Sequence, residues 1–156
     1  MKSSLIVGLS GFAVALFASS QARSAGAIAE GIAPGGVAKG YEIAYRVNRP
    51  STGEARTDAL AGCKKGQERL ASGAVAATDS GNRKARARCA IVISFENKCL
   101  AVALDPKDST PGAGWAIASV QQDADDEALA RCRSVAGADR RDFCKVTNRA
   151  CDGTAK

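Results

Sequence analysis

The sequence contains no histidine in 156 residues, and aromatic side chains are scarce. Without an imidazole the chain cannot build a Ser-His-Asp triad, a Cys-His pair or a His-ligated zinc site. Beyond the first 22 residues the aromatic side chains are Tyr41, Tyr45, Phe95, Trp115 and Phe143. Five are too few for the stacking platforms that bind single-stranded nucleic acid. These absences exclude most familiar hydrolase mechanisms and argue against a nucleic-acid partner.

The first 22 residues have the pattern of a secretory signal peptide. Lys2 gives a positive start, residues 5–18 are apolar, and Ser20 and Ala22 are small residues at the positions that signal peptidase reads. As a helix the apolar run would span about 21 Å, short of the roughly 30 Å hydrocarbon core of a bilayer. We expect cleavage after Ala22, a secreted or periplasmic bacterial protein, and no transmembrane segment after cleavage. Cleavage after Ala27 and an uncleaved anchor are the alternatives.

All six cysteines follow this segment: Cys63, Cys89, Cys99, Cys132, Cys144 and Cys151. An even number of cysteines in an exported chain indicates disulfides, here three. A zinc site would need close Cys-x-x-Cys pairs, which the sequence lacks. We therefore expect a disulfide-stabilised domain that holds no metal and no cofactor.

The charge is basic, with 22 Lys and Arg against 16 Asp and Glu and a formal net charge of +6. Four of the positive residues, Arg83, Lys84, Arg86 and Arg88, stand just before Cys89. Such a cluster can contact an anionic lipid headgroup, an anionic envelope polymer or an acidic protein. The alternative interpretation is a solvated loop in a mildly basic protein.

A nine-residue pattern occurs twice, because residues 55–63 and 124–132 both read A-x-x-[DE]-A-L-A-x-C. Its apolar positions lie on one stripe of a helix, so each copy predicts an amphipathic helix whose cysteine faces a sheet. Ser51 and Glu54 form a capping box before the first helix. Gly66 and Gly137 are the expected ends of the two helices.

Short apolar segments flank both helices and predict strands. They are residues 41–47, 89–95, 99–104, 114–119 and 143–147. The expected fold is α+β, with two pseudo-repeats of strand-helix-strand and both helices on one face of an antiparallel or mixed sheet.

The expected boundaries follow from the same pattern. Residues 23–40, rich in glycine and alanine, are predicted to be a flexible leader. The two units of the domain cover residues 41–104 and 114–151, and residues 152–156 form a tail.

The repeated order of strand, A-x-x-x-A-L-A-x-C helix and cysteine-opened strand resembles the bacterial exported family known as domain of unknown function 4189. The resemblance covers roughly residues 41–151 and implies the fold and export. The family has no assigned activity, so the resemblance implies no catalytic residue. This chain departs from the compact pattern, because 25 residues separate Cys63 from Cys89 where 11 separate Cys132 from Cys144. Residues 67–88 are therefore interpreted as an insertion.

Six cysteines allow 15 pairings, and the duplication favours one of them. If both units keep the same internal bridge, the pairs are Cys63–Cys89, Cys132–Cys144 and Cys99–Cys151. A helix packed on a sheet brings its buried cysteine near the start of the next strand, and the last pair is expected to join the two units. A bridge from Cys63 to Cys132 would contradict this scheme.

The remaining candidates for chemistry are few. Asp105, Asp108 and residues 123–126 lack the spacing of a calcium-binding EF-hand loop. The acidic residues 125–127 are explained by the positive end of a helix dipole. Trp115 is either a ligand platform or a core or rim residue, and its place in an alternating strand favours the second interpretation.

These observations predict a small exported binding module that is not an enzyme and whose ligand is unknown. An inhibitor or immunity-type protein of the cell envelope is one form that such a module takes. The partner would be an unknown protein or an anionic envelope component. The alternatives are an envelope enzyme that uses carboxylates or a thiol, and a structural envelope component.

Overall fold

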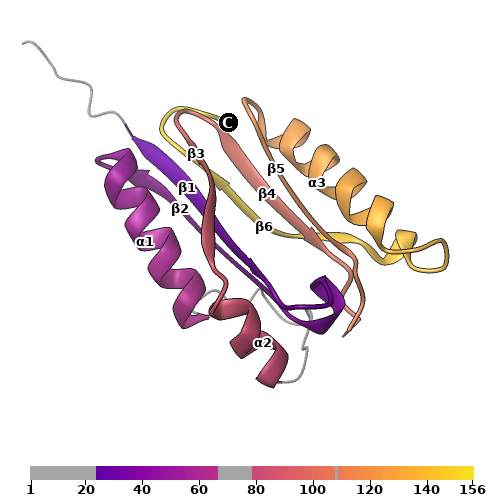
Figure 1. The fold of residues 1–156 in the computed structure, drawn as a ribbon. Helices are drawn as coiled ribbons and strands as arrows, with labels where there is room; N and C mark the ends of the chain where they lie inside the picture. Colours follow the sequence, from indigo (N-terminus) through magenta and orange to yellow (C-terminus); the bar gives the residue numbers. More distant parts are fainter. Residues whose placement is uncertain (1–23, 67–78, 108) are drawn as a thin grey trace, which may run out of the picture.

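The computed structural model describes residues 24–66, 79–107 and 109–156 (Figure 1). The predicted signal peptide and its cleavage site lie outside these residues. In the described part of the chain, no helix is both long and apolar enough to span a membrane.

The first unit contains β1 (Ala25–Ile32), the 3-10 helix η1 (Val37–Lys39), β2 (Tyr41–Arg49), α1 (Thr52–Lys65), α2 (Asp79–Arg86) and β3 (Ala90–Phe95). The second contains β4 (Cys99–Leu104), β5 (Ala113–Ala118), α3 (Gln121–Val135), the 3-10 helix η2 (Arg141–Phe143) and β6 (Lys145–Cys151). Each unit runs strand, strand, helix, strand, with α2 and η2 in equivalent places before the last strand. The α+β class and the two pseudo-repeats are confirmed.

The strands form two antiparallel sheets, ordered β2-β1-β3 and β5-β4-β6. The expectation of one sheet with both helices on one face is corrected. The first strand of each unit takes the centre and pairs on both sides, so each unit completes a sheet of its own. Helix α1 packs on the β1 sheet and α3 on the β4 sheet. Figure 1 shows the two helices on opposite outer sides of the paired sheets.

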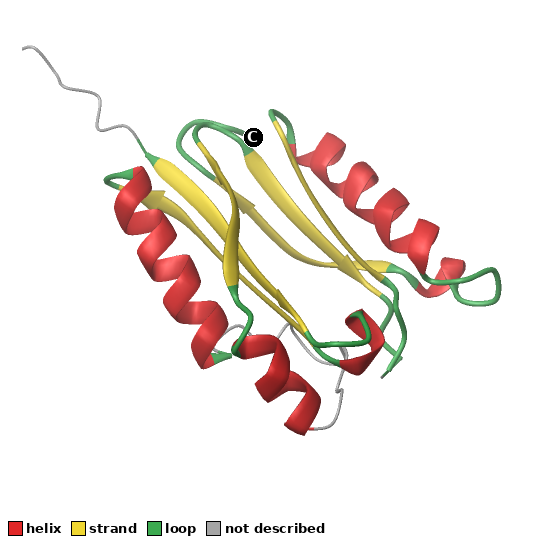
Figure 2. Cartoon of the chain, viewed as in Figure 1, coloured by secondary structure: helices red, strands yellow, loops and turns green. Residues whose placement is uncertain are grey.

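The layer between the sheets holds the large apolar side chains. Its fully buried members are Ile28, Ile43, Leu100, Val102 and Leu104, and Tyr41 and Phe95 complete it. The outer face of each sheet carries alanines instead, which pack against the helix that covers it. The molecule therefore has four layers, helix, sheet, sheet, helix (Figure 2).

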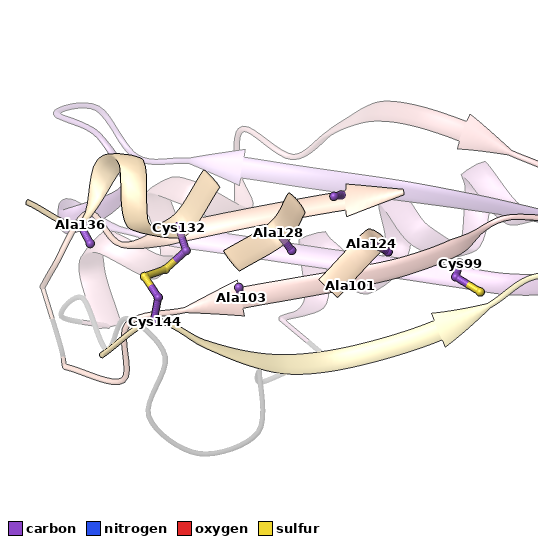
Figure 3. Packing of buried hydrophobic residues seen from close by; sticks show 9 residues of the cluster. Cys99, Ala101, Ala103, Ala124, Ala128, Cys132, Ala136 and Cys144 are labelled. Carbon is purple, nitrogen blue, oxygen red and sulfur yellow. A yellow bond between two sulfur atoms is a disulfide. The ribbon is translucent and has the colours of Figure 1, made fainter. Parts of the chain in front are cut away.

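The alanine faces allow each helix to approach its sheet closely. Ala124, Ala128 and Cys132 of α3 point at Ala101 and Ala103 of β4 (Figure 3). In α1 the equivalent stripe is Ala55, Ala59 and Cys63, all buried. Both predicted helical stripes are thus confirmed.

The ends of α1 are also as predicted. The Ser51 hydroxyl accepts a hydrogen bond from the Glu54 backbone N–H at 3.2 Å. Gly66 adopts the left-handed conformation that ends the helix, with φ 64°. The sequence therefore positions this helix within its unit through local signals alone.

The predicted flexible leader is wrong for residues 25–32, which form β1, the central strand of its sheet. Ala27, Ile28 and Ala29 are fully buried. The same alternation recurs in Ala101, Val102 and Ala103 of β4. The first unit therefore begins at β1, and β4 belongs to the second unit because it is the centre of that sheet.

Helix α2 occupies the second half of the predicted insertion, where a solvated loop had been the alternative. A Cβ atom at Gly40 would lie 2.3 Å from the Gly81 carbonyl oxygen, and one at Gly31 would lie 2.2 Å from that of Ala85. These two glycines allow the backbone of α2 to touch the sheet, so the glycine-rich stretch before β2 is part of the packing.

The three disulfides are Cys63–Cys89, Cys99–Cys151 and Cys132–Cys144, as predicted. Two of them join a helix to the start of the following strand. The expectation that Cys99–Cys151 joins the units is wrong, because these residues face each other on neighbouring strands β4 and β6, with Cα atoms 3.9 Å apart. Every disulfide lies within one unit.

The contact that joins the units near the C-terminus is a buried carboxylate, Asp152. Its oxygens accept hydrogen bonds from the backbone N–H groups of Asn48 and Asn97 at 2.7 and 3.1 Å and from the Ser24 hydroxyl at 3.1 Å. Asp152 has no exposed surface. The predicted tail therefore packs onto the domain, and its Lys156 carbonyl accepts from the Gln121 N–H at 2.8 Å.

The disulfide assignment predicts that the units separate once the chain is cut between them. A specific protease site inserted after Glu96, in the β3–β4 turn, should yield two separate fragments on a denaturing gel without reductant. An alkylating agent is added before denaturation, so that any thiol released by a broken bridge cannot cause disulfide exchange. As a control, a site inserted after Ala138, inside the loop closed by Cys132–Cys144, should give fragments that part only after reduction. Fragments from the first cut that remain joined would contradict the assignment.

Candidate functional site

A pocket of about 300 Å³ lies between the two units, where β2 and β5 are edge strands of their sheets. Glu30, Val37 and Tyr41 line it from the first unit. Ala113, Trp115 and Arg131 are among the residues that line it from the second. The pocket therefore exists only when the two units are packed together.

A carboxylate and a phenol meet on the wall from the first unit. Glu30 is on β1 and half-buried, while Tyr41, at the start of β2, is only 5% exposed. Burial raises the pKa of the Tyr41 hydroxyl well above its usual value, and the nearby Glu30 charge and hydrogen bond raise it further. Tyr41 is therefore neutral and donates its hydrogen to the Glu30 carboxylate.

An aromatic ring and a guanidinium form the wall from the second unit. The Arg131 guanidinium carbon lies 5.7 Å from the centre of the Trp115 ring, within the range of a cation–π contact. Arg131 also pairs with Glu127 one helical turn away. Gly114 makes this possible, because a Cβ atom there would lie 2.5 Å from the Cys132 backbone nitrogen.

The pocket arises where the two repeats differ. Ile28 of β1 corresponds to Val102 of β4, since both face the layer between the sheets and are flanked by buried alanines. Two residues further on, β1 has Glu30 and β4 has Leu104. Their partners on the neighbouring strands are Ile43 and Ala113. The second unit thus has the small Ala113 where the first has Ile43. The first unit has the Glu30 carboxylate where the second has Leu104.

A buried ion pair supports the wall from the second unit. The Asp105 carboxylate has no exposed surface and accepts two hydrogen bonds from Arg140, at 2.9 and 2.6 Å. The Arg140 guanidinium carbon lies 4.0 Å from the centre of the Phe143 ring. The Asp105 N–H donates to the Gly112 carbonyl at 2.8 Å, which closes the loop before Ala113. The pair thereby ties the start of β5 to the segment after α3.

The predicted basic cluster lies elsewhere, on α2 and in the turn that follows it. Arg83 and Lys84 are exposed on α2, and Arg88 is exposed in the turn. Arg86 differs, because its Nε donates to Glu42 at 2.8 Å and it packs against Gly66. The exposed Lys64 and Lys65 end the neighbouring helix α1. We call the exposed set the basic corner: Lys64, Lys65, Arg83, Lys84 and Arg88.

The remaining chemistry of the described residues is restricted. All six cysteines are in disulfides. Within these residues no group of histidine, cysteine or acidic side chains could hold a metal ion. Asp105 and Asp152 are buried and bonded to protein donors, and Asp108 lies outside the described residues. Trp115 packs partly on the core, as predicted, and it also lines the pocket.

The sequence did not identify Glu30, Tyr41 and Arg131 as site residues. Glu30 lies in the segment that had been interpreted as a leader, and Tyr41 lies in a predicted strand without a functional motif. Arg131 occupies a variable position of the repeated helical pattern, directly before Cys132. One signal was available in the sequence. Residues 27–30 read Ala-Ile-Ala-Glu and residues 101–104 read Ala-Val-Ala-Leu, so Glu30 is an acidic residue where the second unit has a leucine.

The Asp105–Arg140 pair predicts a loss of stability in acid. Hydrogen bonds from Arg140 hold the pKa of Asp105 below its usual value of 3.8, so the pair stabilises the fold fully above that pH. Its contribution decreases as the pH falls through the lower pKa of the folded state. Asp105→Asn should lower the free energy of unfolding in urea at pH 7 by about 2–4 kcal/mol. The difference from the unmodified protein should shrink below pH 3.8.

The matched control for this measurement is Asp142→Asn, since Asp142 is exposed. It should change the free energy of unfolding by no more than about 0.5 kcal/mol. A difference between the Asp105 variant and the unmodified protein that stays constant down to pH 2.5 would contradict the assignment.

Comparison with known proteins gives one match. No curated protein and no solved structure is similar to the chain. The match is to a family model, and it covers residues 25–151, from the first residue of β1 to the last of β6. It therefore includes both units and all six cysteines. The chain belongs to the family described as Domain of unknown function (DUF4189).

Proposed function

We propose that this protein is an exported binding module and that the pocket between its units holds the ligand. The observation that carries the proposal is the convergence of Glu30, Tyr41, Trp115 and Arg131, from both units, on one concave site. Ligand sites are typically concave, mainly apolar and provided with a few placed polar groups. The three disulfides are compatible with an extracellular or periplasmic location, and the signal-peptide pattern of the sequence supports export.

Binding is favoured over catalysis by the state of the reactive groups. A thiol-dependent enzyme needs a free thiolate, and each cysteine is bonded to another. A carboxylate-dependent enzyme of the glycosidase type needs two carboxyl groups that face a substrate. Glu30 is the carboxylate that lines the pocket, and its phenol neighbour Tyr41 is held neutral. An inhibitor or immunity-type role and a purely structural role in the envelope are the remaining alternatives.

Native mass spectrometry tests this function. The protein without residues 1–22 is incubated with the low-mass ultrafiltrate of a bacterial periplasmic extract. We expect a ligand that adds a defined mass and is recovered chemically unchanged, since binding without turnover leaves it intact. Ala113→Ile introduces the residue found at the equivalent position of the first unit, and it should abolish the added mass by filling the pocket.

The control is Ala87→Ile, the same enlargement at an exposed position after α2 that does not line the pocket. It should retain the ligand, and both variants should keep the circular dichroism spectrum of the unmodified protein. The proposal fails if no ligand is retained, if Ala113→Ile retains it undiminished, or if the ligand is converted to a product.

The basic corner supports a second contact, with an anionic envelope component. The structure brings the C-terminal end of α1, with its two lysines, beside α2, so five exposed cations gather from two segments of the chain. Clustered cations attract anionic surfaces over a range of about 10 Å at 0.1 M salt. Arg86 is left out of this contact because it is paired with Glu42.

Cosedimentation with phosphatidylglycerol vesicles tests the basic corner. Binding should decrease markedly between about 0.05 M and about 0.3 M salt, because salt screens the attraction. The triple variant Arg83→Ser, Lys84→Ser, Arg88→Ser should bind much less at low salt. The control removes the same charge from dispersed exposed positions, through Arg56→Ser, Arg133→Ser and Lys145→Ser. If both triple variants lose binding equally, net charge is responsible and the corner is not a site.

A further inference from the structure

Two opposite charges face the pocket from different units, and each has spare hydrogen-bonding capacity. A carboxylate offers about four acceptor positions. Among the described residues Glu30 has no ion-pair partner, and the Tyr41 hydroxyl is its donor. A half-buried carboxylate with one neutral donor favours a further donor that carries positive charge. An ammonium group supplies three N–H donors in a small volume.

Arg131 has the complementary capacity. Its guanidinium carries five N–H donors, and the described contacts are the pair with Glu127 and the Trp115 ring. Both members of the Glu127 pair are about half exposed. Exposed pairs of this spacing contribute only about 0.3–0.5 kcal/mol, so a ligand carboxylate can compete for the guanidinium. Stacking on Trp115 holds the guanidinium at the pocket.

The space between the two charges is apolar and small. Val37, Ala113 and Trp115 line it, and its volume of about 300 Å³ is at the lower limit of small-molecule sites. This size suits one amino acid or a very short peptide. The carboxylate is a departure from the repeat, in which β4 has Leu104 at the position of Glu30, so the fold does not require a charge there.

We infer that the pocket binds a zwitterionic α-amino acid, with its ammonium group on the Glu30 carboxylate and its carboxylate on the Arg131 guanidinium. The ligand side chain lies against Trp115 and Ala113. This inference rests on the proposed function of the pocket and names the chemical class of its ligand.

Titration with free amino acids tests the inference. Trp115 is the single tryptophan of the chain, so its emission reports on the pocket alone. The probes are the common L-amino acids, their D-forms, and the N-acetyl and amide derivatives of the tightest binder. We expect a saturable change in emission for the free amino acid. Each blocked derivative should bind at least about tenfold more weakly, because each lacks one of the two charges.

Two charge variants assign each contact to its residue, with affinities measured by calorimetry. Glu30→Gln should weaken the free amino acid and the amide about tenfold or more and leave the N-acetyl form unchanged. Arg131→Gln should weaken the free amino acid and the N-acetyl form and leave the amide unchanged. The controls Glu96→Gln and Arg133→Gln, at exposed positions away from the pocket, should change none of the affinities.

Several outcomes overturn the inference. Blocked derivatives that bind as tightly as the free amino acid would show that the ligand charges do not contribute to binding. Equal weakening of all three compounds by one variant would indicate that the substitution distorts the pocket. If no amino acid binds while native mass spectra still show a ligand that Ala113→Ile removes, the ligand class is wrong and the site is right. If neither experiment shows binding, the proposed function fails as well.

Discussion

Burial of the two central strands on both faces is the constraint on which this structure depends. Strand β4 is buried along its whole length and β1 along most of it, because each lies between a helix and the opposite sheet. Burial of one large aliphatic side chain contributes about 1.5–3 kcal/mol, against about 0.8 kcal/mol for a methyl group. The layer between the sheets, with Ile28, Val102 and Leu104, therefore supplies most of the apolar stabilisation, and the alanine layers under the helices supply less.

The positions of the disulfides follow from that imbalance. A helix held to its sheet by alanines alone is weakly attached, and each main helix carries a cysteine at the end of its buried stripe. A bridge to the following strand contributes about 3 kcal/mol by the loop-closure argument, roughly as much as the burial of three or four alanine methyl groups. No disulfide joins the two units. They are held together by the shared apolar layer and by Asp152, whose carboxylate accepts hydrogen bonds from three segments of the chain.

The pocket is a consequence of an imperfect duplication. Two identical units would meet with equivalent large residues on both faces and would leave little space. In this chain Ala113 occupies the position equivalent to Ile43, and Glu30 that of Leu104, so the layer opens at one end and gains a carboxylate. Gly114 then lets α3 approach β5 closely enough for Arg131 to reach Trp115. The features that distinguish the units are also those that give the pocket its chemistry.

The elements with local signals follow directly from the amino-acid sequence. The repeated A-x-x-[DE]-A-L-A-x-C segments specify two helices with buried cysteines, the Ser51 cap and Gly66 give the limits of the first, and the order of the cysteines in the duplicated pattern indicates their pairing. The division into two sheets, the central place of β1, and the pocket shared by Glu30 and Arg131 arise from tertiary packing. An alanine- and glycine-rich strand has weak intrinsic preference for the extended state, so β1 becomes a strand only through burial against the rest of the fold. The two charges are about 100 residues apart in sequence, and no local pattern connects them, because their proximity depends on how one sheet packs on the other.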